Sequence, residues 1–431
     1  MIFGFGKAKR DDDDDDDYEQ DVEQVLFQGA LNGQQADLAA NARLAEAGLV
    51  PAKEMISDAL RRRAETIRLD PKGNASVVSV FVDGVRYSGG KMPKQRGLAV
   101  TQVIKLLSGL QIKQRTKPQS GGVKVEYREA PYELRVRTTP VEGGERLSVQ
   151  VTNMKESLEK PDEMGFPVEL KEKIRELTGE RRGCVLVCGP PQSGTSTFTR
   201  GVVLCIDSYL YLVNHIVDME GRDLGNVSQF EALPEDDLET TIGRAARSET
   251  DCLYVDPIRN AETAQVLFRM QDKVTLIAEF PARDAATGIA QLNKWVEDPG
   301  VVADGLAGIL SQKLIRRLCE ECKHAFRPNP KLLAKVGLPP ETKALYRPPQ
   351  QDDDSYRCRS CAGLGFKGRM PLFELIEMTE EMKELVASGA GPAEIKSLAR
   401  KLKMPSMQRE GLKLVAAGKT SLEELQRSFK G

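Results

Sequence analysis

A glycine-rich segment in the middle of the chain, GPPQSGTST, has the residue types and spacing of a phosphate-binding loop. It follows the apolar run CVLVC and supplies Gly189 and, after residues 190–193, Gly194, Thr195 and Ser196. In the template GxxxxGK[ST], the glycines let backbone N–H groups point at phosphate oxygens where a helix begins, and the last hydroxyl binds Mg²⁺. The nucleotide contacts that this pattern predicts are Gly189, Gly194, Thr195, Ser196 and Thr197.

The lysine of that template is replaced by Thr195. A lysine ammonium about 4 Å from a phosphate charge, at an effective dielectric constant of about 20, contributes about 4 kcal/mol. A hydroxyl donates one neutral hydrogen bond, with a net contribution of about 1 kcal/mol. Binding through the backbone could survive this replacement, whereas rapid hydrolysis could not. Taken alone, the loop fits either a phosphate site of reduced charge or a structural turn without a ligand.

Two CxxC pairs in the last third of the chain have the spacing of a metal site. Cys319 and Cys322 form the first pair, and Cys358 and Cys361 form the second. Four thiolates in two such turns are typical of a tetrahedral structural Zn²⁺ site, which leaves no position for water. Unrelated reduced thiols and a redox pair are the alternatives, and the polar surroundings disfavour the redox pair. The other cysteines lie in apolar runs and are expected in the core: Cys184, Cys188, Cys205 and Cys252.

Composition and charge disfavour several classes of protein. The chain has 431 residues, 40% of them hydrophobic, so it can bury extensive cores. No apolar stretch approaches the ~18 residues of a membrane-spanning helix, and no secretory signal begins the chain. Lys and Arg number 62 against 64 Asp and Glu, without the basic excess of a general nucleic-acid-binding protein. We therefore expect a cytoplasmic protein with no nucleic-acid partner.

The N-terminal third is expected to hold an acidic tail and a small α+β domain. The run Asp11–Asp17 cannot pack because like charges repel, so we expect a disordered tail over residues 1–34. Residues 35–155 combine helical spacing with strands, including a hairpin closed by Asp83-Gly84. Further turns are predicted at Gly121-Gly122 and Gly143-Gly144.

Residues 156–318 alternate strand-like apolar runs with helical segments. The strand-like runs are Cys184–Cys188, Asn214–Val217, Cys252–Val255 and Val274–Ala278. Such alternation is typical of an α/β fold in which a parallel sheet has helices on both faces. Beyond this region, we expect a tetracysteine module at residues 319–377 and a helical C-terminal region at residues 378–431.

Together, these motifs resemble the type II secretion and type IV pilus assembly ATPases. The segments that carry the resemblance are RVRTTPVEGGERLSVQV (135–151), SQKLIRRLCEECK (311–323), CAGLGFKGRMPLFEL (361–375) and PSMQREGLKLVAAGKTSLEEL (405–425). The resemblance implies a RecA-like P-loop domain, preceded by a smaller α+β domain, that binds ATP and Mg²⁺. It also implies a homo- or hetero-hexameric ring serving an inner-membrane secretion or pilus platform, so that the chain would be cytoplasmic and reach the membrane through its partners.

Departures from the family's pattern fall on residues expected to touch the triphosphate or the attacking water. In DCLYVDPIRN (251–260), Asp251 matches an acidic family position, but Pro257 replaces the catalytic glutamate. Asp256 lies one residue early, so Asp256 and Asp251 are the remaining catalytic candidates. In EFPAR (279–283), Pro281 stands at the position of the family's histidine.

Two further positions concern the charges around the phosphates. The family's arginine after Pro118-Gln119 is replaced by Gly122, although Arg135 remains as a phosphate contact that the resemblance implies. Asp218 and Glu220 keep acidic character without the family's usual pattern. Loss of one positioned electrostatic group typically lowers the catalytic rate by ~10²–10³. The loss of several such groups is therefore expected to impair hydrolysis and not merely to adjust its rate.

These departures lead to the hypothesis of a catalytically weak or inactive ATPase relative that serves as a structural or regulatory ring subunit. A second hypothesis is an active ATPase of the same family that uses displaced groups, such as Asp256 and a Lys or Arg from a neighbouring subunit. A third is a zinc-dependent nucleic-acid-binding protein, which the balanced charge argues against.

Overall fold

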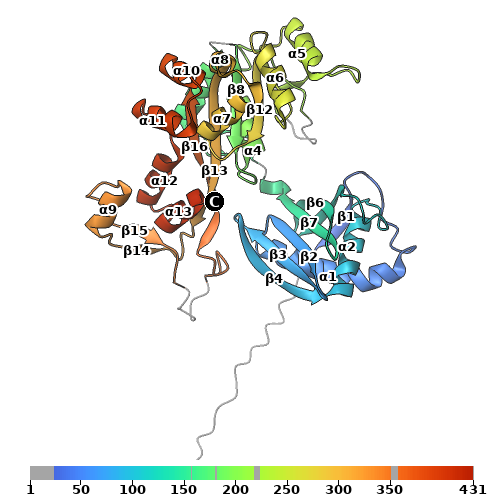
Figure 1. Ribbon diagram of the computed structural model, residues 1–431. Helices are drawn as coiled ribbons and strands as arrows, with labels where there is room; N and C mark the ends of the chain where they lie inside the picture. The colour runs from blue at the N-terminus through green and yellow to red at the C-terminus, as the bar shows by residue number, and fades with distance from the viewer. Residues whose placement is uncertain (1–23, 157, 180–181, 218–223, 351–357, 431) are drawn as a thin grey trace, which may run out of the picture. The chain divides into compact units, whose positions relative to one another are not determined.

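The chain forms two compact units, divided after Ser157, in a computed structural model that describes residues 24–156, 158–179, 182–217, 224–350 and 358–430 (Figure 1). The acidic run Asp11–Asp17 and the acidic residues Asp218 and Glu220 lie outside the described residues. Among the described helices, none combines the length and the apolar character needed to cross a membrane.

The first unit is a seven-stranded antiparallel sheet with two long helices packed against it and against each other. The strand order is β1-β5-β6-β7-β2-β3-β4. Its strands are β1 (Leu26–Ala30), β2 (Thr66–Lys72), β3 (Ala75–Val82), β4 (Val85–Pro93), β5 (Gln119–Tyr127), β6 (Ala130–Val141) and β7 (Gly144–Asn153). The helices are α1 (Ala42–Arg61) and α2 (Lys94–Leu107), and a short 3₁₀ turn, η1 (Met154–Glu156), ends the unit.

The predicted hairpin at Asp83-Gly84 is confirmed, since it joins β3 to β4 with both turn residues at positive φ. The turn predicted at Gly121-Gly122 is wrong, because both glycines lie inside β5 and pair with β6. Their missing side chains allow close packing instead: a Cβ on Gly121 would lie 2.6 Å from the Ser108 carbonyl oxygen. The tail expected over residues 1–34 is also shortened, since β1 pairs with β5.

The second unit is built on a mostly parallel sheet of order β10-β9-β11-β12-β8-β13-β16, in which only β16 runs antiparallel, against β13. Its strands are β8 (Cys184–Gly189), β9 (Val213–His215), β10 (Ser228–Gln229), β11 (Cys252–Tyr254), β12 (Thr275–Pro281), β13 (Leu306–Leu318) and β16 (Phe366–Glu377). The helices beside it are α3 (Val168–Gly179), α4 (Thr195–Leu204), α5 (Leu238–Arg247), α6 (Ala261–Met270), α7 (Ala285–Val296) and α8 (Pro299–Gly305).

The two faces of this sheet bury separate apolar cores, as its strand pattern predicts. In β8, Leu186 packs into the core shared with α6 and α7, whereas Val185 and Val187 pack into the core shared with α3 and α4. Every residue of β8 is buried, which explains why its sequence is apolar throughout rather than alternating. The expectation of a parallel sheet with helices on both faces is therefore confirmed.

The C-terminal part of the chain packs partly on α7 and α8 and partly against β13 and β16. It contains β14 (His324–Phe326), α9 (Pro330–Val336), β15 (Leu345–Arg347), α10 (Glu380–Ala387), α11 (Pro392–Lys401), α12 (Met407–Ala416) and α13 (Leu422–Lys430). Residues 366–377, which the sequence analysis assigned to the tetracysteine module, instead form β16 of the main sheet. The reason is their apolar pairing with β13, where Leu372 and Leu375 are fully buried.

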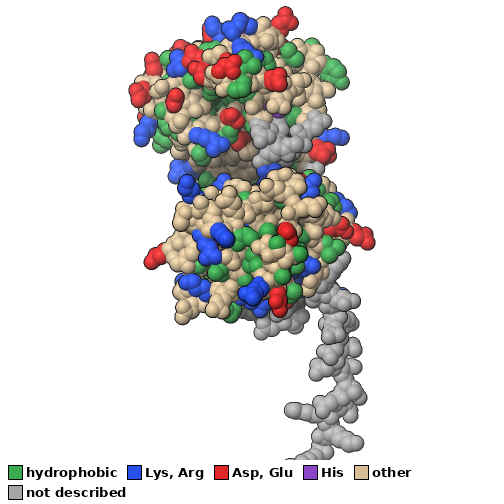
Figure 2. Space-filling view, turned by 90° about the vertical axis from the view of Figure 1, so that its right-hand side faces the viewer, with side chains coloured by type: hydrophobic (Ala, Val, Ile, Leu, Met, Phe, Trp, Pro, Cys, Tyr) green, Lys and Arg blue, Asp and Glu red, His purple; other side chains and the backbone are tan. Residues whose placement is uncertain are grey.

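On the face drawn in Figure 2, basic side chains are interspersed with acidic and apolar ones.

Candidate nucleotide site and metal centre

The glycine-rich loop joins the carboxyl end of β8 to the start of α4, as the sequence pattern requires. Gln192 and Gly194 both adopt positive φ, 66° and 79°, which turns the chain sharply into the helix. A Cβ on Gly189 would lie 2.4 Å from the Ser193 hydroxyl oxygen, so only glycine fits there. The Gln312 side chain fixes the loop from β13 by donating a hydrogen bond of 2.8 Å to the Ser193 carbonyl.

The hydroxyl of Ser196 faces an acidic residue that the sequence analysis did not select. It donates a hydrogen bond of 2.6 Å to Oε1 of Glu279 on β12, the strand beside β8. Glu279 is 7% exposed, and its Oε2 atom is buried without a hydrogen-bond partner among the described residues. The available signal was a lone acid inside the apolar run VTLIAEF, a position that burial normally reserves for a paired or functional carboxylate.

Further polar groups share this face of the sheet. Burial raises the pKa of the Tyr254 hydroxyl on β11, the negative charges of Glu279 and Asp256 raise it further, and the positive charge of Arg200 opposes them. Arg200 lies one helical turn after Ser196 and donates a hydrogen bond of 3.4 Å to Thr197. The loop hydroxyls therefore lie near a mixed group of acidic and basic side chains.

The structure separates the two acidic catalytic candidates. Asp256 lies two residues after the end of β11, at the carboxyl edge where β8 also ends. Asp251 precedes β11 at the opposite edge, where its carboxylate accepts a hydrogen bond of 2.8 Å from the Leu212 amide. At that position Asp251 helps to hold β11 beside the segment that leads into β9. Since a strand rises about 3.3 Å per residue, Asp251 lies too far along the strand from Ser196 for catalysis.

Arg135 and Gly122 lie in the first unit. They face each other across the β5–β6 pair, so the position that lost the family's arginine is directly opposite the one that was kept. A contact between Arg135 and a nucleotide held by the second unit remains a prediction.

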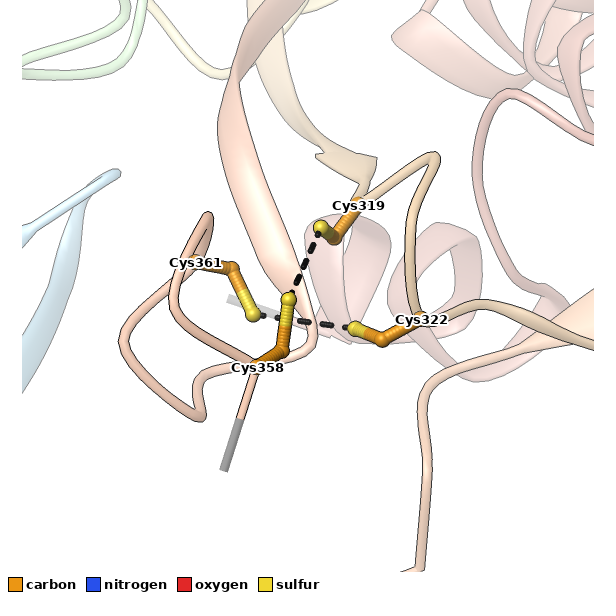
Figure 3. A group of neighbouring side chains, drawn as sticks. All are labelled: Cys319, Cys322, Cys358 and Cys361. Atoms are coloured by element: carbon orange, nitrogen blue, oxygen red, sulfur yellow. Dashed lines mark hydrogen bonds between the residues drawn. The ribbon is translucent and has the colours of Figure 1, made fainter. Parts of the chain in front are cut away.

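The four paired cysteines form one buried cluster between the end of β13 and the start of β16 (Figure 3). Their sulfur atoms point toward one another and all lie within 4.8 Å, with 3.8 Å from Cys319 to Cys358 and 3.6 Å from Cys322 to Cys361. Tetrahedral Zn–S bonds of about 2.3 Å place sulfurs about 3.8 Å apart, so the cluster has the dimensions of a Zn²⁺ site. The Gly365 amide donates to the Cys361 sulfur, as expected around a thiolate.

The other four cysteines lie in the apolar cores, as predicted. Burial raises the pKa of Cys184, Cys205 and Cys252 to about 12, and it also raises that of Cys188. A thiol with so high a pKa is protonated at neutral pH and is therefore a poor nucleophile.

The sequence model of the type II/IV secretion system protein family matches residues 46–427, nearly the whole described chain. The chain belongs to this family. It is 30% identical over 383 residues to the type IV pilus assembly ATPase PilB of Thermus thermophilus, and the match covers 86% of this chain. It is 26% identical to the type II secretion system protein HxcR of Pseudomonas aeruginosa, with 86% of this chain and 75% of HxcR covered.

Solved structures support the fold of this secretion-family chain. The DotB ATPase of Legionella pneumophila gives a TM-score of 0.52 at 16% identity, covering 88% of this chain and 95% of DotB. The pilus retraction motor PilT, solved with bound ADP, also gives 0.52 at 16% identity, covering 87% of this chain and 96% of PilT. The RecA-like fold class is therefore confirmed. The chain spans 42% of the length of the Thermus PilB that it matches.

Proposed function

We propose that this chain is a nucleotide-binding ring subunit of a type II secretion or type IV pilus machine in which ATP hydrolysis is weak or lost. The observation that carries the proposal is the set of side chains around Ser196. The loop keeps its glycines and its hydroxyl, but Thr195 replaces the lysine, and the acid in contact with Ser196 is Glu279.

Binding and hydrolysis place different demands on such a site. Binding needs the backbone N–H groups of the loop and the start of α4, which the sharp turn at Gly194 supplies. Hydrolysis also needs an acid that orients water and positive charge that stabilises the transition state. Pro257 and Pro281 offer neither, since proline has no side-chain proton donor or acceptor. We infer that ATP and Mg²⁺ bind, held by the loop and Ser196, while turnover is slow.

The wider arrangement follows from the family. Hexamers of this chain, alone or mixed with an active relative, would present the nucleotide sites to a secretion or pilus platform at the cytoplasmic side of the inner membrane. Zn²⁺ bound by the four cysteines would join the end of β13 to the start of β16 and hold the segment that contains β14, α9 and β15 to the sheet.

Two measurements on the purified full chain test this proposal. Calorimetry should detect ADP binding in the presence of Mg²⁺, and this binding should weaken in Ser196→Ala but not in Ser388→Ala, a control at the exposed end of α10. A phosphate-release assay should give a rate at least ~10²-fold below that of the Thermus PilB assayed in parallel. Absence of ADP binding to the unmodified chain would contradict nucleotide binding.

The contact between Ser196 and Glu279 also favours a second candidate, an active ATPase that uses displaced acids. In that case Asp256 or Glu279 would orient the attacking water, and a basic residue of a neighbouring subunit would replace the lysine. Fast phosphate release that disappears in Ser196→Ala and persists in Ser388→Ala would favour this candidate over the first.

A further inference from the structure

The carboxylate of Glu279 is only half satisfied. Its Oε1 atom accepts the Ser196 hydrogen bond, whereas Oε2 is buried and has no protein partner among the described residues. A buried carboxylate oxygen without a partner is unfavourable, and it points to a group such as a water or a cation at that place. Since the Ser196 side is exposed while Glu279 is covered, such a group would enter from the loop.

Charge around this position differs from that of an ordinary phosphate-binding loop. The lysine position carries the neutral Thr195, so its ammonium is missing, while Glu279 adds a carboxylate in contact with the loop's hydroxyl. Asp256 adds a second negative charge near the same tyrosine, and Arg200 one positive charge. A polyphosphate entering this loop without a cation would therefore meet a carboxylate beside Ser196 and no ammonium from position 195.

We propose that Ser196 and Glu279 together form a divalent-cation site, and that nucleotide binding at the loop depends on this cation. The inference rests on the proposed function and specifies how that site is controlled. Mg²⁺ favours carboxylate, hydroxyl, water and phosphate oxygens, and Ser196 and Glu279 supply the first two. Bound there, it would offset the carboxylate and attract the phosphates. Without it, Glu279 repels them.

In this proposal Glu279 is a direct ligand of the cation. The simplest competing role is a structural one, in which its hydrogen bond with Ser196 holds the start of α4. The substitution Glu279→Gln separates the two roles, because the amide oxygen keeps the acceptor for Ser196 and removes only the charge.

The test compares ADP binding to the full-length chain in Mg²⁺ with binding in EDTA. For the unmodified protein we expect affinity at least about tenfold weaker in EDTA, since like charges at short range are strongly unfavourable. In Glu279→Gln, binding in EDTA should strengthen by about tenfold, and the difference between the two conditions should largely disappear. Glu374→Gln on β16 is the matched control, a partly buried glutamate of the same sheet that accepts a hydrogen bond from Ala285, and it should keep the full dependence on Mg²⁺.

The possible outcomes distinguish the cation dependence from nucleotide binding itself. Equal binding of ADP in Mg²⁺ and EDTA by the unmodified protein would overturn the cation dependence and leave nucleotide binding in place. An unchanged Mg²⁺ dependence in Glu279→Gln would overturn the role of Glu279 and favour the structural role. No ADP binding by the unmodified protein or by either variant, in either medium, would contradict the proposed function itself.

Discussion

Removal of one thiolate from the tetracysteine cluster should release Zn²⁺ and loosen the segment that contains β14, α9 and β15, while leaving the main sheet folded. The substitution is Cys358→Ser, which replaces one of the four buried sulfurs. Ser360→Ala is the matched control, because Ser360 lies between the two cysteines of the second pair and its hydroxyl accepts a hydrogen bond of 3.0 Å from the exposed Lys367 side chain. We expect one Zn²⁺ per chain in the unmodified protein and in the control.

The size of the effect follows from the loop that the metal closes. Residues 323–357 run between the two cysteine pairs and include β14, α9 and β15. A cross-link around a loop of about 35 residues contributes about 4 kcal/mol in the chain-entropy description. The packing of Leu333, Leu338 and Leu345 remains, so the segment should open locally rather than unfold with the whole chain.

Hydrogen exchange and metal analysis measure this effect directly. A change of about 4 kcal/mol in local opening corresponds to about 10³-fold faster amide exchange, at about 1.4 kcal/mol per factor of ten. The faster exchange should be confined to β14, α9 and β15, with β8 and β12 unaffected. Protein that holds no zinc after purification without chelators would contradict this prediction, and so would identical exchange of these segments in Cys358→Ser and Ser360→Ala.

Two smaller predictions concern stability. Lys105→Met should destabilise the first unit by about 3–5 kcal/mol in urea unfolding, because it leaves the buried Glu145 carboxylate without its 2.8 Å ion pair. The double variant Lys105→Met, Glu145→Gln should recover most of this lost stability. Equal stability of the single and double variants would count against a buried ion pair. Asp284 caps α7 by accepting from the Thr287 amide and pairs with Lys396, interactions that outweigh its burial and lower its pKa to about 2. Because the folded-state pKa of Asp284 lies below its unfolded-state pKa, the contribution of this carboxylate to the free energy of unfolding is complete above about pH 4 and is lost as pH falls toward 2. Asp284→Ala should therefore be less stable than the unmodified protein at pH 7, and its stability should fall less steeply in acid. A series of unfolding curves at different pH values measures both effects.

Sequence reasoning succeeded where the signal was local. The cysteine pairs and the Asp83-Gly84 turn each depend on neighbouring residues whose chemistry restricts the backbone. The buried strand around Val185 was also visible, because only a strand covered on both faces is apolar at every position.

Sequence reasoning failed where the meaning of a residue depends on a distant partner. Glu279 and Ser196 are 83 positions apart, and their contact arises from the β8–β12 register and the position of α4. Gly121 was taken for a turn residue because glycine usually permits one, whereas here it permits close approach of the Ser108 carbonyl. In both cases the decisive atom belongs to another element of the fold.

The glycines of the loop and the buried acid beside it carry different information about ligands. Gly189 is required by the Ser193 and Thr195 hydroxyls and the Gln312 carbonyl around it, so packing alone preserves it in a chain that binds nothing. Glu279 is different, because a carboxylate with an unpartnered buried oxygen opposes folding and gains nothing from the core. A loop that had become a purely structural turn would be more stable with a neutral residue there. The buried charge of Glu279 is therefore the stronger argument that the loop binds a ligand, and that this ligand includes a cation.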